Sequence, residues 1–404
     1  KGLTIDFDKA RKEVKKYIEQ YHMDVQLDKK VSQISVGEAQ RVEIIKTLMR
    51  GADIIILDEP TAVLTPQEAE RLFEILNNLK QDGKSLVFIS HKLNEVMAIS
   101  DRISVMRQGQ YMGTVNKEET SPLDLTKRMI GREVFLNIDK AYSEAGDTIL
   151  EVQDVWIPSQ KETSKIRGMS LHVKAGEIVG VAGIDGNGQS ELVEAITGLR
   201  KVEKGKILLC GKDITNQSPR KVRESGLSHI PEDRNTRGLN RAMTIEENLI
   251  AVRLDQPPFT KGIMMNKSGQ DAYAKEMVEQ FDIRPADYNL PTSSLSGGNA
   301  QKVVVAREVS LGNKLLVASQ PTRGVDIGAI ELIRNTLEKA KKAGAGVLLV
   351  SAELEEIISL SDRIVVIHEG KITGEMRADE ANENNLGLLM MGGTDTGKDG
   401  EAAV

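Results

Sequence analysis

The stretch Ile54-Ile55-Ile56-Leu57-Asp58-Glu59-Pro60-Thr61 decides how the rest of the chain is interpreted. Four consecutive aliphatic residues predict a strand that is buried on both faces of a parallel sheet. Two carboxylates follow at the carboxyl end of this strand, where open α/β sheets place their ligands. Asp58 could help to hold a hydrated Mg²⁺ on a nucleotide, and Glu59 could take a proton from an attacking water. A buried strand that ends in a solvated acidic turn is the alternative interpretation.

The composition limits the classes of function. The chain has 404 residues, enough for two or three domains with complete cores. Its net charge is −6, so no basic excess indicates nucleic acid as a partner. The one cysteine, Cys210, excludes an internal disulfide and fits a reducing compartment. The sequence has no apolar run of about 18 residues, so we expect no membrane span.

Two parts of the sequence repeat each other at a constant offset. From Asp101 to Asp362 this offset is 261 residues, and no insertion is needed to keep it. We therefore expect two copies of one fold. The offset pairs Ser35 with Ser296, Gly37 with Gly298, Gln40 with Gln301, Pro60-Thr61 with Pro321-Thr322, and Gly131 with Gly392.

The repeat sets the expected domain boundaries. Residue 1 corresponds to position 262, and about 113 residues between roughly 148 and 261 have no counterpart upstream, so we expect an N-terminally truncated first copy. We assign residues 1–131 to the C-terminal part of the first domain, 132–148 to a polar linker, 149–393 to the second domain, and 394–404 to a disordered tail.

Strands and helices alternate along each copy, which predicts an α/β fold with a parallel sheet. In the first copy we expect a buried strand at 85–90 and short antiparallel strands within 103–115. Ser35 suits the N-cap of a helix that runs to Met49. Further helices are expected at 7–21, 66–81 and 121–130.

The loop Gly183-Ile184-Asp185-Gly186-Asn187-Gly188-Gln189-Ser190 follows an expected strand at 178–182 and opens a helix. A phosphate-cradling loop needs this context, and its glycines let backbone N–H groups turn toward an anion. The P-loop pattern G-x-x-x-x-G-K-[ST] is matched at Gly183, Gly188 and Ser190, but Gln189 replaces the lysine.

With these motifs in this order, the chain resembles the ATPase subunit of an ABC transporter over nearly its whole length. The resemblance is to the tandem form, with two P-loop nucleotide-binding domains that each join a parallel-sheet core to helical and antiparallel β subdomains. Both Ile34-Ser35-Val36-Gly37-Glu38 and Leu295-Ser296-Gly297-Gly298-Asn299 match the L-S-G-G-Q signature. The strand from Ile54 to Glu59 matches Walker B, and His91 lies at the switch histidine.

The resemblance implies ATP and Mg²⁺ as cofactors and a role for each motif. Asp58 would bind Mg²⁺ through water, Glu59 would be the general base, and His91 would hold the γ-phosphate and orient the attacking water. In the family, the signature of one domain grips the nucleotide of the other. The expected nucleotide-binding residues are Ser35, Gly37, Glu38, Gly183, Gly186, Gly188, Gln189, Ser190, Ser296, Gly297, Gly298 and Asn299.

The two copies differ at these catalytic positions. At the offset of 261, Asp58-Glu59 corresponds to Ser319-Gln320, and His91 corresponds to Ala352. We therefore expect one competent composite site, which joins the first Walker B motif to the second signature, and one degenerate site. The phosphate loop of the competent site is expected outside this chain, so the chain alone should hydrolyse ATP negligibly.

Tandem ATPases with a degenerate second half resemble the importers of simple sugars and of nucleosides. The segment His229-Ile230-Pro231-Glu232-Asp233-Arg234 is similar to part of that group's second half, at about the place of the Q-loop. Sugar members keep Asp-Glu before Pro321-Thr322, so Ser319-Gln320 favours the nucleoside branch. The resemblance implies two transmembrane permeases and an extracytoplasmic substrate-binding protein as partners. It also implies a peripheral location on the cytoplasmic face of the plasma membrane.

Two other classes remain open. Tandem ABC ATPases also act on ribosomes without a membrane partner, but those carry a longer, charged linker and keep both catalytic glutamates. Here the linker has about 17 residues, and Gln320 replaces a glutamate. A non-catalytic regulatory fragment is the third interpretation.

Overall fold

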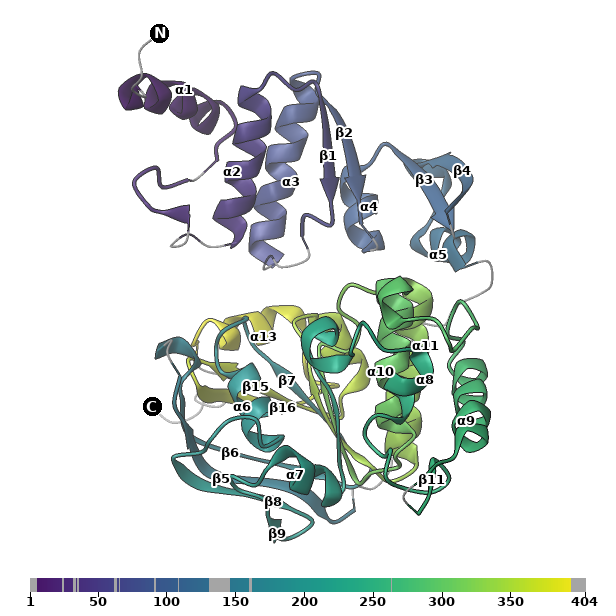
Figure 1. Ribbon diagram of the computed structural model, residues 1–404. Coiled ribbons are helices and arrows are strands. Elements are labelled where there is room, and N and C mark those ends of the chain that lie inside the picture. Colours follow the sequence, from purple (N-terminus) through teal and green to yellow (C-terminus); the bar gives the residue numbers. More distant parts are fainter. Residues whose placement is uncertain are drawn as a thin grey trace, which may run out of the picture. The chain divides into compact units, whose positions relative to one another are not determined.

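The computed structural model describes residues 6–23, 25–31, 34, 36–61, 64, 66–90, 92–107, 109–130, 146–159, 162–262 and 264–393. Its internal contacts divide the chain into two compact units, Lys1–Val134 and Phe135–Val404, which are described separately (Figure 1). The predicted tail at 394–404 and most of the predicted linker lie outside the described residues. No helix of the described part is both long and apolar enough to cross a membrane.

The first unit alternates helices with short strands, as predicted. β1 and β2 pair in parallel, with Ile54 opposite Ser85 and Asp58 opposite Ile89, whereas β3 and β4 form an antiparallel pair. The elements are α1 (Phe7–Gln20), α2 (Val36–Met49), β1 (Ile54–Asp58), α3 (Pro66–Gln81), β2 (Ser85–Ile89), α4 (Leu93–Ile99), β3 (Arg102–Arg107), β4 (Gln110–Asn116), the 3₁₀ turn Lys117–Glu119, and α5 (Pro122–Ile130).

The sheet of the first unit is buried on one face only, so the prediction of strands buried on both faces is wrong here. Ile55 and Leu57 are 3% and 6% exposed and pack in the core with α2 and α3. Ile54 and Ile56, on the opposite face of β1, are 65% and 67% exposed. Aliphatic residues on both faces of a strand indicate that both faces can be buried, but burial of both requires a covering layer on each face of the sheet. The described residues of this unit supply one layer.

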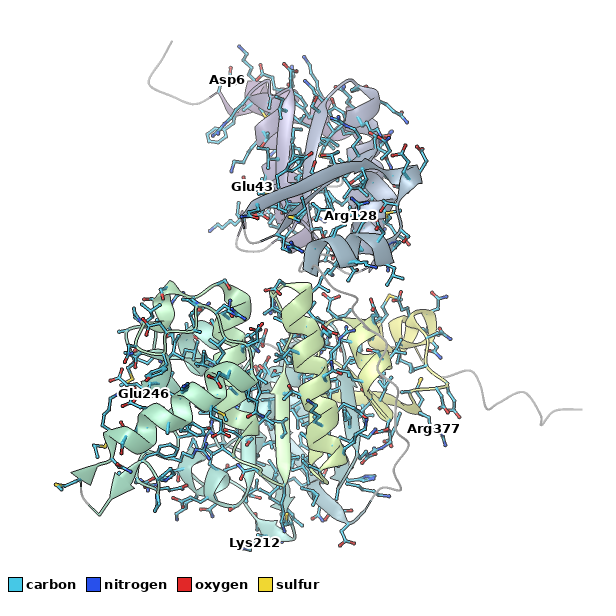
Figure 2. All side chains as sticks on the ribbon, turned by 90° about the vertical axis from the view of Figure 1, so that its right-hand side faces the viewer. Asp6, Glu43, Arg128, Lys212, Glu246 and Arg377 are labelled. Carbon is cyan, nitrogen blue, oxygen red and sulfur yellow. The ribbon has the colours of Figure 1, made fainter. Side chains whose placement is uncertain are left out.

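The second unit contains a six-stranded sheet in the order β10-β13-β14-β7-β15-β16, parallel except for β16. A separate antiparallel sheet has the order β6-β5-β8-β9. Lys212, on β9, is exposed at the outer end of this second sheet (Figure 2). The elements are β5 (Thr148–Ile157), β6 (Ile166–Lys174), β7 (Ile178–Ala182), α6 (Gln189–Ile196), β8 (Lys204–Leu209), β9 (Lys212–Asp213), α7 (Pro219–Glu224), β10 (Leu227–Ile230), the π-helix η4 (Arg234–Gly238), α8 (Ile245–Ile250), β11 (Thr260–Lys261), β12 (Met264–Met265), α9 (Lys267–Gln280), α10 (Gly297–Val309), β13 (Leu315–Ser319), α11 (Ile327–Lys342), β14 (Gly346–Val350), α12 (Leu354–Leu360), β15 (Arg363–His368), β16 (Lys371–Arg377) and α13 (Glu383–Met390), with 3₁₀ turns at Glu162–Ser164 and Thr292–Ser294.

Two cores enclose the six-stranded sheet. On one face, Leu316 and Ala318 of β13 pack with residues of α10 and α11. On the other, Leu315 and Val317 pack with the antiparallel sheet and α6. All five residues of β13 are therefore buried, as predicted for a doubly covered parallel strand.

The repeat in the sequence is a repeat in the structure. Adding 261 to the bounds of β1, α3, β2, α4, β3 and β4 gives the bounds of β13, α11, β14, α12, β15 and β16 without a shift. The bounds of α1, α2 and α5 agree with those of α9, α10 and α13 within one residue. Each described helix and strand of the first unit therefore has a counterpart in the second, which permits a comparison of the described residues at matching positions.

Candidate functional site

The predicted phosphate loop lies between β7 and α6 of the second unit. Gly186 and Gly188 have φ angles of +88° and +114°, a backbone region that favours glycine. Among the described residues, no side chain caps the amino end of α6, which begins at Gln189. The first N–H groups of this helix therefore fit a phosphate, with the helix dipole in the favourable direction.

Gln189 occupies the position of the P-loop lysine but is turned into the loop. Its side chain is 7% exposed, and its amide donates a hydrogen bond to the Ile184 carbonyl at 3.1 Å. A Cβ atom added to Gly183 would lie 2.3 Å from Gln189 Nε2 and 2.7 Å from the Ile367 carbonyl oxygen, so only glycine fits at 183 in this arrangement. The loop can thus bind phosphate through backbone N–H groups but without the positive charge of a lysine.

Ser190, the next residue of the loop, contacts a carboxylate. Its hydroxyl lies 3.3 Å from Glu232 Oε2 and donates a hydrogen bond to it. A hydroxyl beside a carboxylate is an oxygen pair that suits Mg²⁺. The described residues contain no cluster of three or more His, Cys, Asp or Glu side chains placed to hold a metal. Glu232 was not among the predicted site residues, although the sequence drew attention to its segment.

Asp58 is the last residue of β1 and Glu59 follows it, so both carboxylates lie at the carboxyl end of this strand. The Asp58 side chain is exposed, and the Glu59 N–H donates to the Ile89 carbonyl at 2.9 Å. Glu59 has a φ of +46°. A non-glycine residue with positive φ is strained, and such strain concentrates at functional sites. An exposed carboxylate followed by a carboxylate on a strained turn fits the metal holder and base assigned to these residues.

The second unit keeps this backbone but not its charge. Gln320 has a φ of +48°, and its N–H donates to the Val350 carbonyl at 2.7 Å, like Glu59. Its side-chain carbonyl accepts the Ala352 N–H at 3.1 Å, at the position that corresponds to His91. Ser319 is buried, 3% exposed. This turn cannot supply a carboxylate to a metal or a base to a water.

His91 lies outside the described residues, but a contact that fixes its neighbours is described. Glu95 accepts a hydrogen bond from Thr61 at 2.6 Å and another from Ser90 at 3.2 Å. It therefore joins the turn after Glu59 to the residue before His91. The sequence does not indicate this link, because a Glu in the first turn of a helix is usual for electrostatic reasons.

The same link is present in the second unit. Thr322 donates to Glu356 at 2.8 Å, and Glu356 is fully buried. Burial raises the pKa of Glu356 even though the nearby Arg334 opposes the shift. The link is thus common to both units and independent of the catalytic residues that differ between them.

The second signature forms the amino end of α10, as predicted. Ser296 is the N-cap and accepts the Asn299 N–H at 3.4 Å and the Asn299 side-chain amide at 3.0 Å. A Cβ at Gly297 would lie 2.8 Å from Arg234 Nη2, and a Cβ at Gly298 would lie 2.4 Å from Asp326 Oδ2. A larger residue at either position would have to displace one of these side chains, and the loop presents backbone N–H groups at a helix terminus.

The first signature is described in part. Gly37 is buried, and a Cβ there would lie 2.5 Å from Glu68 Oε1. Glu38 lies in the first turn of α2, whereas Ser35 lies outside the described residues. The pairing of Asp58 and Glu59 with the signature of the other unit stays a prediction, because the units are described separately.

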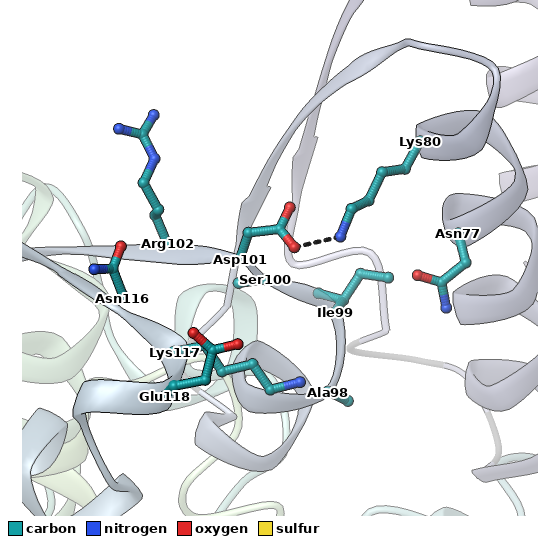
Figure 3. A pocket seen from close by; sticks show the side chains of 10 residues that line it. All are labelled: Asn77, Lys80, Ala98, Ile99, Ser100, Asp101, Arg102, Asn116, Lys117 and Glu118. Atoms are coloured by element: carbon teal, nitrogen blue, oxygen red, sulfur yellow. Dashed lines mark hydrogen bonds and ion pairs between the residues drawn. The ribbon is translucent and has the colours of Figure 1, made fainter.

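One pocket of about 390 Å³ lies in the first unit, away from these motifs (Figure 3). It includes the Lys80–Asp101 ion pair and Arg102, at the start of β3. In the second unit the counterpart Asp362 accepts the Ile178 N–H at 2.8 Å, at the start of β7. The pocket therefore corresponds to the amino edge of the parallel strands, opposite their ligand-binding edge.

Comparisons with known proteins agree with this set of motifs. A family model described as ABC transporter matches residues 2–62 and 166–323. A nucleoside import ATP-binding protein of Lactococcus lactis is 47% identical over 97% of this chain and 78% of its own length. A guanosine import ATP-binding protein of Bacillus subtilis is 45% identical over 96% of this chain and 76% of its own. A ribose import ATP-binding protein of Caldanaerobacter subterraneus is 38% identical over 96% and 77%.

Solved structures share the fold. A nucleotide-free ATP-binding cassette from an ABC transporter matches with a TM-score of 0.50 at 25% identity, over 60% of this chain and 95% of that chain. An ATP-binding subunit of an ABC transporter matches with a TM-score of 0.52 at 22% identity, over 60% and 100%.

Proposed function

Since the chain belongs to the ABC transporter family, as an ATP-binding subunit of the nucleoside and sugar importers, we propose that it energises the import of a nucleoside. The observation that supports the mechanism is the contrast between two turns with the same positive φ and the same backbone hydrogen bond: Asp58-Glu59 carries two carboxylates, and Ser319-Gln320 carries none. The nucleoside substrate is supported by the relatives at 47% and 45% identity, whose names specify nucleoside and guanosine import.

Hydrolysis is proposed at the site that contains Asp58, Glu59 and His91. Mg²⁺ bound to ATP neutralises phosphate charge, and Asp58 would hold it through water. Glu59 would take the proton from the attacking water, and His91 would hold the γ-phosphate and orient that water. The signature Ser296–Asn299 would complete this site with N–H groups from α10.

The second site is proposed to bind ATP without hydrolysing it. Backbone N–H groups between Gly183 and Ser190 would hold the phosphates, and the first signature, with Ser35, Gly37 and Glu38, would complete the site. Residues 1–131 and 149–393 would be the parts of the two ATPase domains, joined by 132–148. The proposed partners are two permeases and an extracytoplasmic substrate-binding protein, at the cytoplasmic face of the membrane.

The chain alone is proposed to hydrolyse ATP negligibly. Its sequence contains no match to the P-loop pattern with lysine, and Gln189 stands at that position of its one recognised phosphate loop. Phosphate release by the purified chain would be compared with that of Glu59→Gln. A rate well above background that Glu59→Gln abolishes would contradict this part of the proposal.

Transport is tested by uptake in a strain that lacks the gene. Labelled guanosine, ribose and glucose would be offered to cells complemented with the wild-type gene, with Glu59→Gln, or with Gln320→Glu as the matched control. We expect guanosine uptake that Glu59→Gln abolishes and Gln320→Glu leaves within about twofold, because the second turn also lacks a metal-binding carboxylate. Ribose or glucose uptake instead would identify a sugar importer.

The alternative classes are tested by isolating the tagged protein. A ribosome-associated ATPase would sediment with ribosomes, whereas the proposed subunit would copurify with two integral membrane proteins from detergent extracts. Recovery with ribosomes alone would reject the import function.

A further inference from the structure

The segment Glu232-Asp233-Arg234 follows β10, and the proposed function assigns it no role. All three side chains make defined contacts. Asp233 accepts hydrogen bonds from the Asn235 N–H at 2.9 Å, and from the Thr236 N–H and hydroxyl at 3.1 and 2.7 Å. The Thr236 hydroxyl in particular lowers the pKa of Asp233, so this carboxylate stays ionised as the cap of η4. The cap fixes the backbone between its two charged neighbours.

Arg234 joins the turn after β13 to the second signature. Its guanidinium donates to the Arg323 carbonyl at 2.7 Å and to the Gly324 carbonyl at 3.1 Å. Its Nη2 also lies against Gly297, where a Cβ would approach to 2.8 Å. The planar guanidinium binds two carbonyl oxygens at once, and the single ammonium group of a lysine cannot reproduce this arrangement.

Glu232 joins the same turn to the phosphate loop. Its Oε1 accepts the Arg323 guanidinium at 2.7 Å, and its Oε2 accepts the Ser190 hydroxyl at 3.3 Å. A cation held by Ser190 would lie beside Oε2 and would compete with Arg323, which binds Oε1, for the negative charge of this one carboxylate. The state of the phosphate loop and the position of the Arg323 side chain are thus linked.

Two further contacts tie this turn to the signature helix. The Gln301 amide donates to the Pro321 carbonyl at 2.8 Å, with both groups buried. Asp326, the N-cap of α11, lies against Gly298. Residues 321–326 are therefore held between the phosphate loop on one side and the signature on the other.

We propose that Glu232 and Arg234 couple the two ATP sites: Mg·ATP at Gly183–Ser190 moves the turn 321–326 through Glu232, and Arg234 passes this shift to the signature Ser296–Asn299. Arg234 is then a positioning residue for the signature that completes the hydrolytic site. The inference rests on the proposed binding of ATP at the second site. It gives that non-hydrolytic site a regulatory role in the reaction at the other.

Hydrogen–deuterium exchange on the whole 404-residue chain tests the coupling without requiring hydrolysis. Amide exchange would be followed in 183–192, 295–300 and 321–326, with and without Mg·ATP. In the wild type we expect all three segments to respond, with exchange slowed about tenfold, the factor that one additional charged hydrogen bond provides. In Arg234→Ala we expect the same response in 183–192 and none in 295–300.

Further variants separate coupling from folding. Arg234→Lys keeps the charge but not the two-carbonyl fork, so the response of 295–300 should fall to a small fraction while the chain stays folded. In Glu232→Gln, segment 321–326 should no longer respond to Mg·ATP, because the amide cannot replace the carboxylate that binds both Arg323 and Ser190. Arg220→Ala, which removes an exposed arginine on α7, is the matched control and should behave like the wild type.

The outcomes are distinguishable. If the phosphate loop responds in the wild type but 295–300 does not, or if 295–300 responds as strongly in both Arg234 variants as in the wild type, the coupling is rejected and ATP binding stands. If 183–192 itself shows no response to Mg·ATP, binding at the second site is rejected and the coupling with it.

Discussion

The imidazole of His229, on the strand that leads to Glu232, predicts a specific loss of stability in acid. Its Nε2 atom is buried and has no hydrogen-bond partner among the described residues. Burial lowers the pKa of His229 to about 4, against the attraction of Glu308 and with the repulsion of Arg223, Arg237 and Arg307. The folded protein therefore keeps this ring neutral at pH values where the unfolded chain protonates it.

The direction and the size of the change in the free energy of unfolding follow from the difference in proton binding between the folded and unfolded states. Above pH 6.5 the ring is neutral in both states and contributes nothing. Between pH 6.5 and 4 only the unfolded chain binds the proton, so the free energy of unfolding falls as the pH falls. With the folded pKa at about 4, the loss is about 2 kcal/mol at pH 5 and about 3 kcal/mol at pH 4, relative to pH 7.5. Below pH 4 the folded ring is protonated as well, and the loss levels off at about 3.4 kcal/mol.

The assay is urea unfolding followed by the fluorescence of Trp156, the one tryptophan, which lies in the same unit as His229. The free energy of unfolding would be measured from pH 7.5 to 4 for the wild type, His229→Gln and His229→Phe. The difference in the free energy of unfolding between the wild type and a variant cancels the contributions of all other titrating groups. It should change by about 2 kcal/mol between pH 7.5 and 5, equally for both variants, because neither replacement titrates. Parallel pH profiles of wild type and variants would refute the reasoning.

Three further predictions concern the core, a buried charge and the phosphate loop. Ile55→Ala should lower the free energy of unfolding of the first unit by about 2–5 kcal/mol, whereas the matched Ile56→Ala should cost less than about 1 kcal/mol, because only Ile55 is buried; denaturant titration of both variants checks this. Glu308→Gln should destabilise the second unit by about 3–5 kcal/mol in the same Trp156 assay, since it leaves the buried Arg307 and the partly buried Arg223 without their carboxylate. Gln189→Lys should tighten Mg·ATP binding about tenfold in calorimetry, through a charge-assisted contact to phosphate, without producing hydrolysis at the Ser319-Gln320 turn.

The sequence was sufficient for the fold where the evidence was periodic or repeated. Alternating strand and helix patterns placed β7 and α3, and the offset of 261 residues carried each α-helix and strand of the first unit onto one of the second. It failed at Ile54 and Ile56, which are as apolar as the buried Leu315 and Val317 but are exposed. The hydrophobic pattern of a strand shows which of its faces can be buried. Whether a face is buried depends on residues that are distant in the sequence and form the covering layer.

Some features of the candidate site could likewise be predicted from the local sequence, and others could not. The sequence located the loop at Gly183–Ser190 and the signature at Ser296, because glycine spacing and capping residues are local. It could not predict that Gln189 turns back to the Ile184 carbonyl, or that Arg234 reaches Arg323 and Gly324, 89 and 90 residues away. Contacts over such separations depend on the sheet that brings the loops together, so no local pattern contains them.

The second unit preserves the geometry of a catalytic turn whose chemistry is absent. Gln320 keeps the strained positive φ of Glu59, and Thr322 keeps the hydrogen bond to Glu356 that Thr61 makes to Glu95. A turn used only for packing would gain stability by losing this strain, which costs about 1–3 kcal/mol. The same turn leads into the Arg323 and Gly324 carbonyls that Arg234 binds beside the signature. A function that needs the position of this turn, but not its carboxylates, accounts for both the strain that is kept and the charge that is missing. Positioning the signature for the other site is such a function.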